Sequence, residues 1–236
     1  MGHHIRLDLQ IVFASRWHAG SGESSLMTDR LIRRNGRNHP FIPAATLKGI
    51  VRQSCEKLSR TLGFPHPSDP HQGALSEQGA FVPSTQIVSP VDHLFGTRFE
   101  PGGLFFRDAC LKEDGLGTAL VRNRVARHRV LGTAKEKQLF TTEYILPEIL
   151  CTRIDGWHKD LVTLDDDNPP YEYCLLIAGI LAVERIGGDK STGAGWLDKI
   201  ALESGQYNGS TLDLDKVLDL FELVTWEDYS ELRGER

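Results

Sequence analysis

The chain has 236 residues and carries 27 Lys and Arg against 32 Asp and Glu, giving a formal net charge of −5. Apolar residues make up 40% and charged residues 25%, which is typical of a globular protein with a core and excludes a disordered chain. The longest apolar run, 174–183, is too short to span a bilayer, and the first residues lack the layout of a signal peptide. We therefore expect a cytoplasmic protein with no membrane partner.

Charge is distributed unevenly along the chain. Residues 1–60 hold ten Lys and Arg against four Asp and Glu, residues 121–140 hold six against one, and residues 201–236 hold three against nine. Two basic segments in an acidic chain favour a surface that binds an anionic polymer. Ordinary solvated faces give the same counts, so charge alone leaves both interpretations open.

The first sixty residues predict a strand, a loop and a helix. Residues 5–14 alternate apolar and polar side chains, as half-buried strands do, and the Gly- and Ser-rich residues 15–25 predict a loop. A helix with an apolar stripe follows, for which Thr46 is the expected N-cap. Lys48 and Arg52 lie one turn apart, off that stripe and near the helix start. The helix dipole disfavours cations there, so we expect an anion beside them.

The rest of the chain alternates strands with one further helix. Residues 63–90 are rich in Pro, Gly and Ser without periodicity and predict an irregular insertion. Residues 171–188 fit helical spacing between a start at Asn168 and a stop at Gly187 and Gly188, with a strand as the alternative. Strands are expected over residues 102–111, 143–154 and 195–204. The order strand, helix, strand, strand, helix, strand matches an α+β, ferredoxin-like unit.

A glycine-rich segment, GGDKSTGAG, occupies residues 187–195. It is not a Walker A loop, because Asp189 rather than Gly precedes Lys190, and it precedes a predicted strand rather than a helix. Backbone N–H groups of such a turn can still form a concave anion site, with Lys190, Ser191 and Thr192 as further donors. A tight turn without a ligand is the alternative.

The second basic segment, residues 121–140, contains four arginines within eight residues. Arg donates two parallel hydrogen bonds to phosphate, which makes it the preferred side chain for that anion. The alternation of Arg122, Arg124, Arg127 and Arg129 with apolar residues suits an extended hairpin with one cationic face. A mobile solvated loop is the alternative.

Asp29 is the only Asp between Asp8 and Asp69, and four arginines follow it within eight residues. A carboxylate in such surroundings can hold a divalent cation or position a proton transfer beside a bound phosphate. A surface Asp paired with one of those arginines has the same sequence. The spacing of the residues does not decide between the two.

These segments occur in a recognisable order along the chain. IPAATLKGIVR (42–52), HLFGT (93–97), GGLFFRDACL (102–111), RVARHRVLGTAKEKQLFTTEYI (124–145) and GGDKSTGAGW (187–196) follow one another. In this order they resemble the RAMP superfamily of CRISPR proteins, and most of all the backbone subunits of type III effector complexes. The resemblance extends over about residues 5–204.

The resemblance implies a single RAMP domain over residues 1–236, with a ferredoxin-like, RRM-related core. It also implies an insertion at about 63–100 and a thumb hairpin at about 113–147 that displaces a nucleotide. The helix after IP, the thumb arginines and the glycine-rich loop would bind RNA. The residues that it assigns to RNA are Lys48, Arg52, Thr46, Arg122, Arg124, Arg127, Arg129, Gly187, Gly188, Lys190, Ser191, Thr192 and Gly193.

The resemblance also implies the activity and the partners. Subunits of this class bind guide RNA (crRNA) and cleave complementary target RNA, together with other RAMP subunits and the large effector subunit. An aspartate in the loop before IP cuts the target, a position that Asp29 fills, with Glu23 as the other nearby carboxylate. Mg²⁺ or another divalent cation would serve as cofactor for cleavage, giving a 2′,3′-cyclic phosphate and a 5′-OH.

The chain departs from its relatives in two places. Ala44 and Ala45 replace small polar residues, so that only Thr46 keeps a hydroxyl. The segment before LFGT holds His66, His71 and His93 but no Cys, so no resident metal site is expected there.

Three alternatives stay open. The first is a non-catalytic RAMP capping or structural subunit. The second is a stand-alone guide-processing endoribonuclease that uses His18 and His128 as acid and base. The third is an unrelated enzyme that binds a nucleotide phosphate on the glycine-rich loop.

Overall fold

The structure, a computed structural model, describes residues 2–65, 67, 89–97, 100–112, 115–164 and 168–233. Most of the insertion predicted at 63–100, with His66 and His71, lies outside the described residues. None of the helices in the described residues is long and apolar enough to span a membrane.

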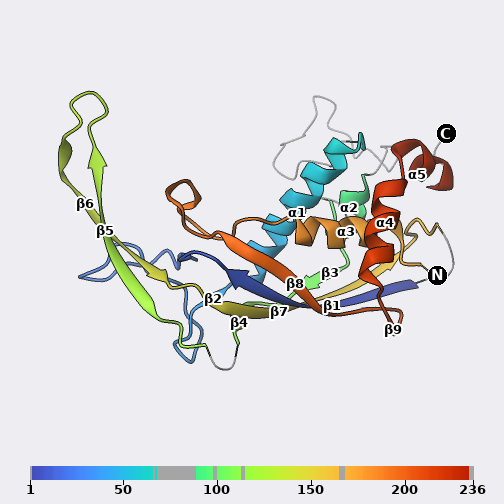
Figure 1. Ribbon diagram of the computed structural model, residues 1–236, viewed down its shortest axis with the longest axis horizontal. Helices are drawn as coiled ribbons and strands as arrows, with labels where there is room; N and C mark the ends of the chain where they lie inside the picture. The colour runs from blue at the N-terminus through green and yellow to red at the C-terminus, as the bar shows by residue number, and fades with distance from the viewer. Residues whose placement is uncertain are drawn as a thin grey trace.

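One antiparallel sheet forms the centre of the molecule (Figure 1). Its strands run in the order β2, β4, β7, β1, β8, β9, and β3 joins β4 along the same edge of β7. Their bounds are β1 Gly2–Phe13, β2 Phe41–Ile42, β3 Leu104–Phe106, β4 Ala109–Leu111, β7 Ile149–Lys159, β8 Leu197–Tyr207 and β9 Ser210–Thr211.

The central strands reproduce the ferredoxin-like order. Strand β1 lies between β7 and β8, and the edge strands β3 and β4 pair with the far side of β7, all antiparallel. Helix α1 (Ala44–Thr61) connects β1 to the β3 and β4 edge, and α3 (Tyr171–Leu181) connects β7 to β8. This confirms the α+β, ferredoxin-like prediction.

The helices cover one face of the sheet (Figure 1). The inward side chains of β1 are Ile5, Leu7, Leu9, Ile11 and Phe13, each at most 5% exposed, as the period-two alternation predicted. Every residue of α3 from Tyr171 to Ile180 is buried, because the helix lies between the sheet and helices α1, α2 (Pro90–Phe95) and α4 (Leu214–Leu223). A short helix, α5 (Trp226–Arg233), follows α4.

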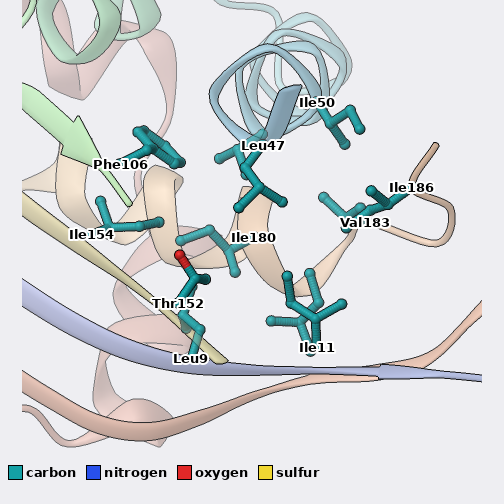
Figure 2. A pocket seen from close by; sticks show the side chains of 12 residues that line it. Leu9, Ile11, Leu47, Ile50, Phe106, Thr152, Ile154, Ile180, Val183 and Ile186 are labelled. Carbon is teal, nitrogen blue, oxygen red and sulfur yellow. The ribbon is translucent and has the colours of Figure 1, made fainter. Parts of the chain in front are cut away.

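A small apolar gap remains where α1 meets the sheet (Figure 2). Its volume of about 10 Å³ is at the lower limit for one water molecule, and aliphatic side chains line nearly all of it. Ile50 of α1 faces Val183 and Ile186 across it, so the start of α1 holds the segment that leads into the glycine-rich loop (Figure 2).

A two-stranded hairpin, β5 (Ala119–Arg127) and β6 (Ala134–Ile145), projects from the sheet (Figure 1). It forms a sheet of its own within the segment predicted to be thumb-like. Arg122 and Arg124 occupy alternate positions of β5. Arg129 lies in the turn after the strand, and a register shift between Val125 and Arg127 interrupts the pairing.

Four predicted boundaries were wrong. The α1 helix begins at Ala44, with Pro43 as its N-cap, so Thr46 lies inside the first turn. Helix α3 ends at Leu181 instead of Gly187, because the chain becomes extended and Arg185 pairs with Trp196. The single strands predicted at 102–111 and 143–154 are each interrupted. The first divides into β3 and β4, and the second spans the end of β6 and the start of β7.

Candidate functional site

The loop after β1 and the glycine-rich loop both contact strand β6 at the base of the hairpin. One edge of β6 pairs with β5, while the other edge bonds to the loop after β1. Trp17 and Ile145 exchange two backbone hydrogen bonds of 2.9 Å. Further along, Arg30 donates its N–H to the Thr141 carbonyl and accepts from the Glu143 N–H, both within 3.1 Å. The loop that carries Asp29 is therefore fixed to the hairpin.

Asp189 connects the glycine-rich loop to the other two segments. Its carboxylate accepts from Arg124 at 2.7 Å and Arg30 at 3.1 Å, and from the Tyr144 hydroxyl at 2.7 Å. Its side chain is 13% exposed. Burial opposes ionisation, but these three donors outweigh it and lower the pKa of Asp189 to about 2. One carboxylate thus ties together the Asp29 loop, both strands of the hairpin and the glycine-rich loop.

The loop conformation depends on glycines at two close approaches. Gly187 has a φ of +101°, and the position of a Cβ there would lie 2.6 Å from the His18 carbonyl oxygen. Gly195 has a φ of +77°, and a Cβ would lie 2.1 Å from the Ile186 oxygen. Between them, Asp189 has a left-handed φ of 57° and a short 3-10 turn spans Lys190–Thr192. Only glycine fits at either close approach.

Asp29 is exposed, and the hairpin orients its carboxylate. Thr141 of β6 donates to Oδ2 from both its backbone N–H at 2.6 Å and its hydroxyl at 3.0 Å. These bonds lower the pKa of Asp29, because they favour the charged form. Asp29 makes no ion pair within the part of the chain that the structure describes. Three of the arginines that follow Asp29 instead contact Asp189, Glu143 and the Ser21 carbonyl.

A surface pocket of about 250 Å³ opens beside Asp29. His18, Glu23, Asp29, Arg30 and Leu31 line it, together with two glycines. His18 is 2% exposed and its Nδ1 lies 2.7 Å from the Glu143 carbonyl oxygen, which fixes the ring. The pocket therefore brings together a cation and two carboxylates, one of them held by the hairpin.

A partly buried ion pair supports the loop that carries Asp29. Arg34 lies 2.6 Å from a Glu143 oxygen, and the other oxygen of Glu143 accepts from the Ile32 N–H at 2.9 Å. Glu143 lies two residues after Thr141 on β6. Its bonds to Arg34 and Ile32 therefore strengthen the contact between the Asp29 loop and the hairpin. Two of the arginines that follow Asp29 in the sequence, Arg30 and Arg34, are therefore partnered by Asp189 and Glu143.

The cations of α1 lie apart from this cluster. The Lys48 ammonium is 3.4 Å from the Leu104 carbonyl oxygen, and burial together with Arg52 lowers its pKa. Arg52 pairs with Glu56 at 2.9 Å and lies 3.6 Å from Asp92. Lys48 thus faces β3, whereas Ile50 faces the segment before the glycine-rich loop on the opposite flank of α1 (Figure 2).

The anion expected beside the start of α1 belongs to the protein itself. Asp108, between β3 and β4, accepts the Ala44 N–H at 2.7 Å and so caps the helix from outside. Thr46, half-buried in the first turn, donates its own N–H to the Pro43 carbonyl. Intramolecular carboxylates therefore lie beside Ala44 and Arg52, whereas Lys48 contacts a backbone carbonyl.

The remaining predicted RNA-binding residues lie on the glycine-rich loop and on the hairpin. Gly188 donates its N–H to the His18 carbonyl at 2.8 Å, and Thr192 accepts from Arg124 at 2.9 Å through its hydroxyl. The others are exposed or half-exposed at the surface. They are Arg122, Arg127 and Arg129 on the hairpin, and Lys190, Ser191 and Gly193 on the loop.

Several residues that organise the site escaped the sequence prediction. Asp189 entered only as the reason for rejecting a Walker A loop, although an acidic residue among glycines and cations is itself a signal. Thr141, Glu143 and Tyr144 gave none, because nothing in the sequence indicates that β6 pairs on both edges. Arg16, whose guanidinium lies 5.0 Å from the centre of the Tyr144 ring, was also missed.

The chain was compared with known proteins. The family model described as the RAMP superfamily matches residues 10–198, which include the end of β1, helix α1, the hairpin and the glycine-rich loop. No curated protein matches the chain.

Proposed function

The chain belongs to the RAMP superfamily, and on that premise we propose that it is a backbone subunit of a type III CRISPR effector complex that binds guide RNA and cleaves target RNA. Family membership supports a CRISPR-associated, RNA-binding protein whose partners are RNA and other components of a CRISPR complex. The subunit class and the cleavage are the proposal. The observation that carries it is the position of Asp29, held by Thr141 of the hairpin at the edge of a charged pocket.

Guide RNA would bind across the base of the hairpin and the glycine-rich loop. Arg122 and Lys190 reach the surface there and can contact phosphates, each of which releases counterions and makes binding weaken with salt. The backbone amides of the loop add donors that read the shape of the backbone. Base pairing between guide and target would then supply the sequence specificity.

The hairpin has the exposed apolar side chains that a wedge between nucleotides requires. Val130 and Leu131 in its turn are 87% and 69% exposed, and Leu139 further down β6 is 65% exposed. When an apolar side chain is inserted between bases, its new contacts with the bases offset the free energy that unstacking costs. Leu139 lies two residues from Thr141, which bonds to Asp29, so a nucleotide displaced at Leu139 would lie near the carboxylate.

The pocket suits a divalent cation that RNA helps to hold. No group of three His, Cys, Asp or Glu side chains within the described residues forms a complete protein site. Asp29 and Glu23 line the same pocket, and Mg²⁺ is ordinarily bound through one or two carboxylates together with phosphate oxygens. When bound there, Mg²⁺ would neutralise charge on the scissile phosphate.

Asp29 would act on the ribose next to the displaced nucleotide. The 2′-oxygen attacks the adjacent phosphorus as the Asp29 carboxylate takes up its O–H proton, the bond to the 5′-oxygen breaks, and that oxygen takes up a proton from solvent. The products are a 2′,3′-cyclic phosphate and a 5′-OH. The low pKa of Asp29 keeps it ionised at neutral pH. Arg30 on the pocket wall can stabilise the negative charge that develops on the phosphoryl oxygens.

Replacement of Asp29 tests the proposal in the assembled effector complex. With Asp29→Ala, we expect guide RNA binding to survive and cleavage of the target at the position of this subunit to stop. Asp198→Ala, at an exposed position of β8, is the matched control and should cut normally. Undiminished cutting by the Asp29 variant would remove Asp29 from this role, and an uncut target with the unaltered protein would identify a non-cleaving subunit.

A further inference from the structure

An exposed stack of Arg185 on Trp196 lies at the foot of the glycine-rich loop. The Arg185 guanidinium carbon is 3.5 Å from the centre of the indole ring, which is direct cation–π contact. The guanidinium covers one face of the ring, yet Trp196 remains 38% exposed. The stack therefore presents a flat, polarisable surface to solvent.

The backbone holds this stack rigidly on both sides of the loop. Arg185 and Trp196 form a β-bridge, and the Trp196 carbonyl accepts from Ala14 at 2.9 Å and from Ser15 at 3.3 Å. The Trp196 N–H donates to the Ser15 hydroxyl at 2.9 Å. The backbone of Trp196 is thus anchored at the end of β1, and the Arg185 guanidinium packs against its ring.

Cations surround the stack on the side of the loop. Arg185 itself reaches the Lys190 carbonyl oxygen at 3.4 Å, and Arg16 reaches that of Thr192 at the same distance. Arg124 donates to the Thr192 hydroxyl. Three arginines and Lys190 therefore lie around one short turn, and Asp189 is the acidic residue that they enclose.

We propose that the Arg185–Trp196 stack is a platform for one unpaired nucleobase of the bound RNA. Aromatic rings and guanidinium planes both accept bases by stacking, without preference for sequence, and adjacent cations hold the phosphates on either side. The platform rests on the proposed RNA binding and adds a specific contact to it. The bound base would extend the Arg185–Trp196 stack by one further planar group.

A second exposed tryptophan provides the matched control. Trp157 of β7 is 61% exposed and stacks on His4 at 4.1 Å, but it lies on the open face of the sheet. Arg6 and Asp155 pair at 2.8 Å on the neighbouring strands, so charge there is balanced instead of cationic. Both tryptophans are exposed and stacked. At Trp157 the nearby Arg6 is paired with Asp155, whereas Trp196 lies beside a cluster of arginines and Lys190.

The experiment measures binding of a single-stranded homopolymeric RNA of about 12 nucleotides to the full chain, by fluorescence anisotropy at several salt concentrations. We expect Trp196→Leu to weaken binding about 5- to 100-fold with an unchanged salt slope, because stacking and not charge is lost. Trp196→Phe should keep most of the affinity, and Trp157→Leu should keep all of it. Thermal unfolding confirms that each variant is folded.

Three outcomes would overturn the platform. The first is that Trp196→Leu binds as tightly as the unaltered chain, the second that Trp196→Phe loses as much affinity as Trp196→Leu, and the third that Trp157→Leu weakens binding equally. If the unaltered chain binds and cleaves RNA while the Trp196 variants bind normally, the platform alone is wrong. If the unaltered chain binds no RNA, both the platform and the proposed function are wrong.

Discussion

Arg124 on the hairpin and Asp189 on the glycine-rich loop form an ion pair of 2.7 Å, and the same carboxylate accepts from Arg30 of the Asp29 loop. The pair therefore connects the elements to which the proposal assigns RNA binding, target distortion and cleavage. Since the two arginines converge on one anion, removal of that anion leaves two like charges close together. The geometry of the site depends on Asp189 more than on either arginine.

Asp189→Asn should make the stability of the protein less dependent on pH. The folded-state pKa of Asp189, about 2, lies below the ordinary value of 3.8, so ionised Asp189 stabilises the fold above about pH 4 and that contribution is lost as the pH falls toward 2. After allowance for solvent screening, we expect a loss of about 1 kcal/mol at neutral pH. Thermal unfolding between these pH values measures it, with Asp198→Asn as the control. A variant whose stability changes with pH as steeply as that of the unaltered chain would contradict the assignment.

The two groups of predicted RNA-binding cations should behave differently when removed. Arg52 is paired with Glu56 and Asp92 inside the protein, so Arg52→Ala should cost about 1–2 kcal/mol of stability and leave the salt dependence of RNA binding unchanged. Lys190→Ala should lower the slope of log K against log salt by about 1 and leave stability within about 0.5 kcal/mol. Unfolding curves and salt titrations on both variants separate the effects. If the Arg52 variant lowers the salt slope, α1 is part of the RNA-binding surface.

The central fold could be predicted because it depends on local patterns. The alternation in β1 and the apolar stripe of α1 each specify which face is buried, and the order of the elements then specifies the ferredoxin-like sheet. The start of α1 could not be predicted, because its cap comes from Asp108, far away in the sequence. Local propensity carries no information on such a partner.

The candidate site was predicted in part for the same reason. The cations at Arg124 and Lys190 are visible as charge clusters, and Asp29 is visible as a lone acid among arginines. Their relations are not visible, because they depend on how β6 pairs with the Asp29 loop. The assignment of Lys48 and Arg52 to RNA rested on the resemblance, and the helix dipole added the expectation of an anion beside them. The structure pairs Arg52 with Glu56 of the same helix and with Asp92 of α2, a partner that the sequence does not indicate.

The glycine-rich loop should tolerate substitution at Gly193 but not at Gly195. Both have a positive φ, but a Cβ at Gly193 meets nothing within 4 Å, whereas at Gly195 it would lie 2.1 Å from the Ile186 oxygen. We expect Gly193→Ala to cost about 1 kcal/mol through φ alone, and Gly195→Ala to cost about 3 kcal/mol or more with loss of RNA affinity. Thermal unfolding and RNA binding measure both. Equal costs at the two positions would show that the close approach to Ile186 is unimportant.

The hydroxyl of Thr141 should be needed for cleavage and not for guide binding. Thr141→Val keeps the shape and the backbone donor to Asp29 but removes the hydroxyl bond to Oδ2, which raises the pKa of Asp29 and loosens its orientation. We expect about a tenfold lower cleavage rate at saturating target, an acid limb of the pH–rate profile that moves to higher pH, and an unchanged affinity for guide RNA. Thr141→Ser should restore the rate.

Thr142→Val is the control on the same strand. The Thr142 hydroxyl is buried and bonds to nothing within the described residues, so its replacement should leave the rate unchanged and the stability equal or higher. The Thr141 and Thr142 variants differ by one position along β6, and only Thr141 bonds to Asp29. Equal rates in both would mean that the hairpin does not orient the carboxylate, whatever the outcome at Asp29 itself.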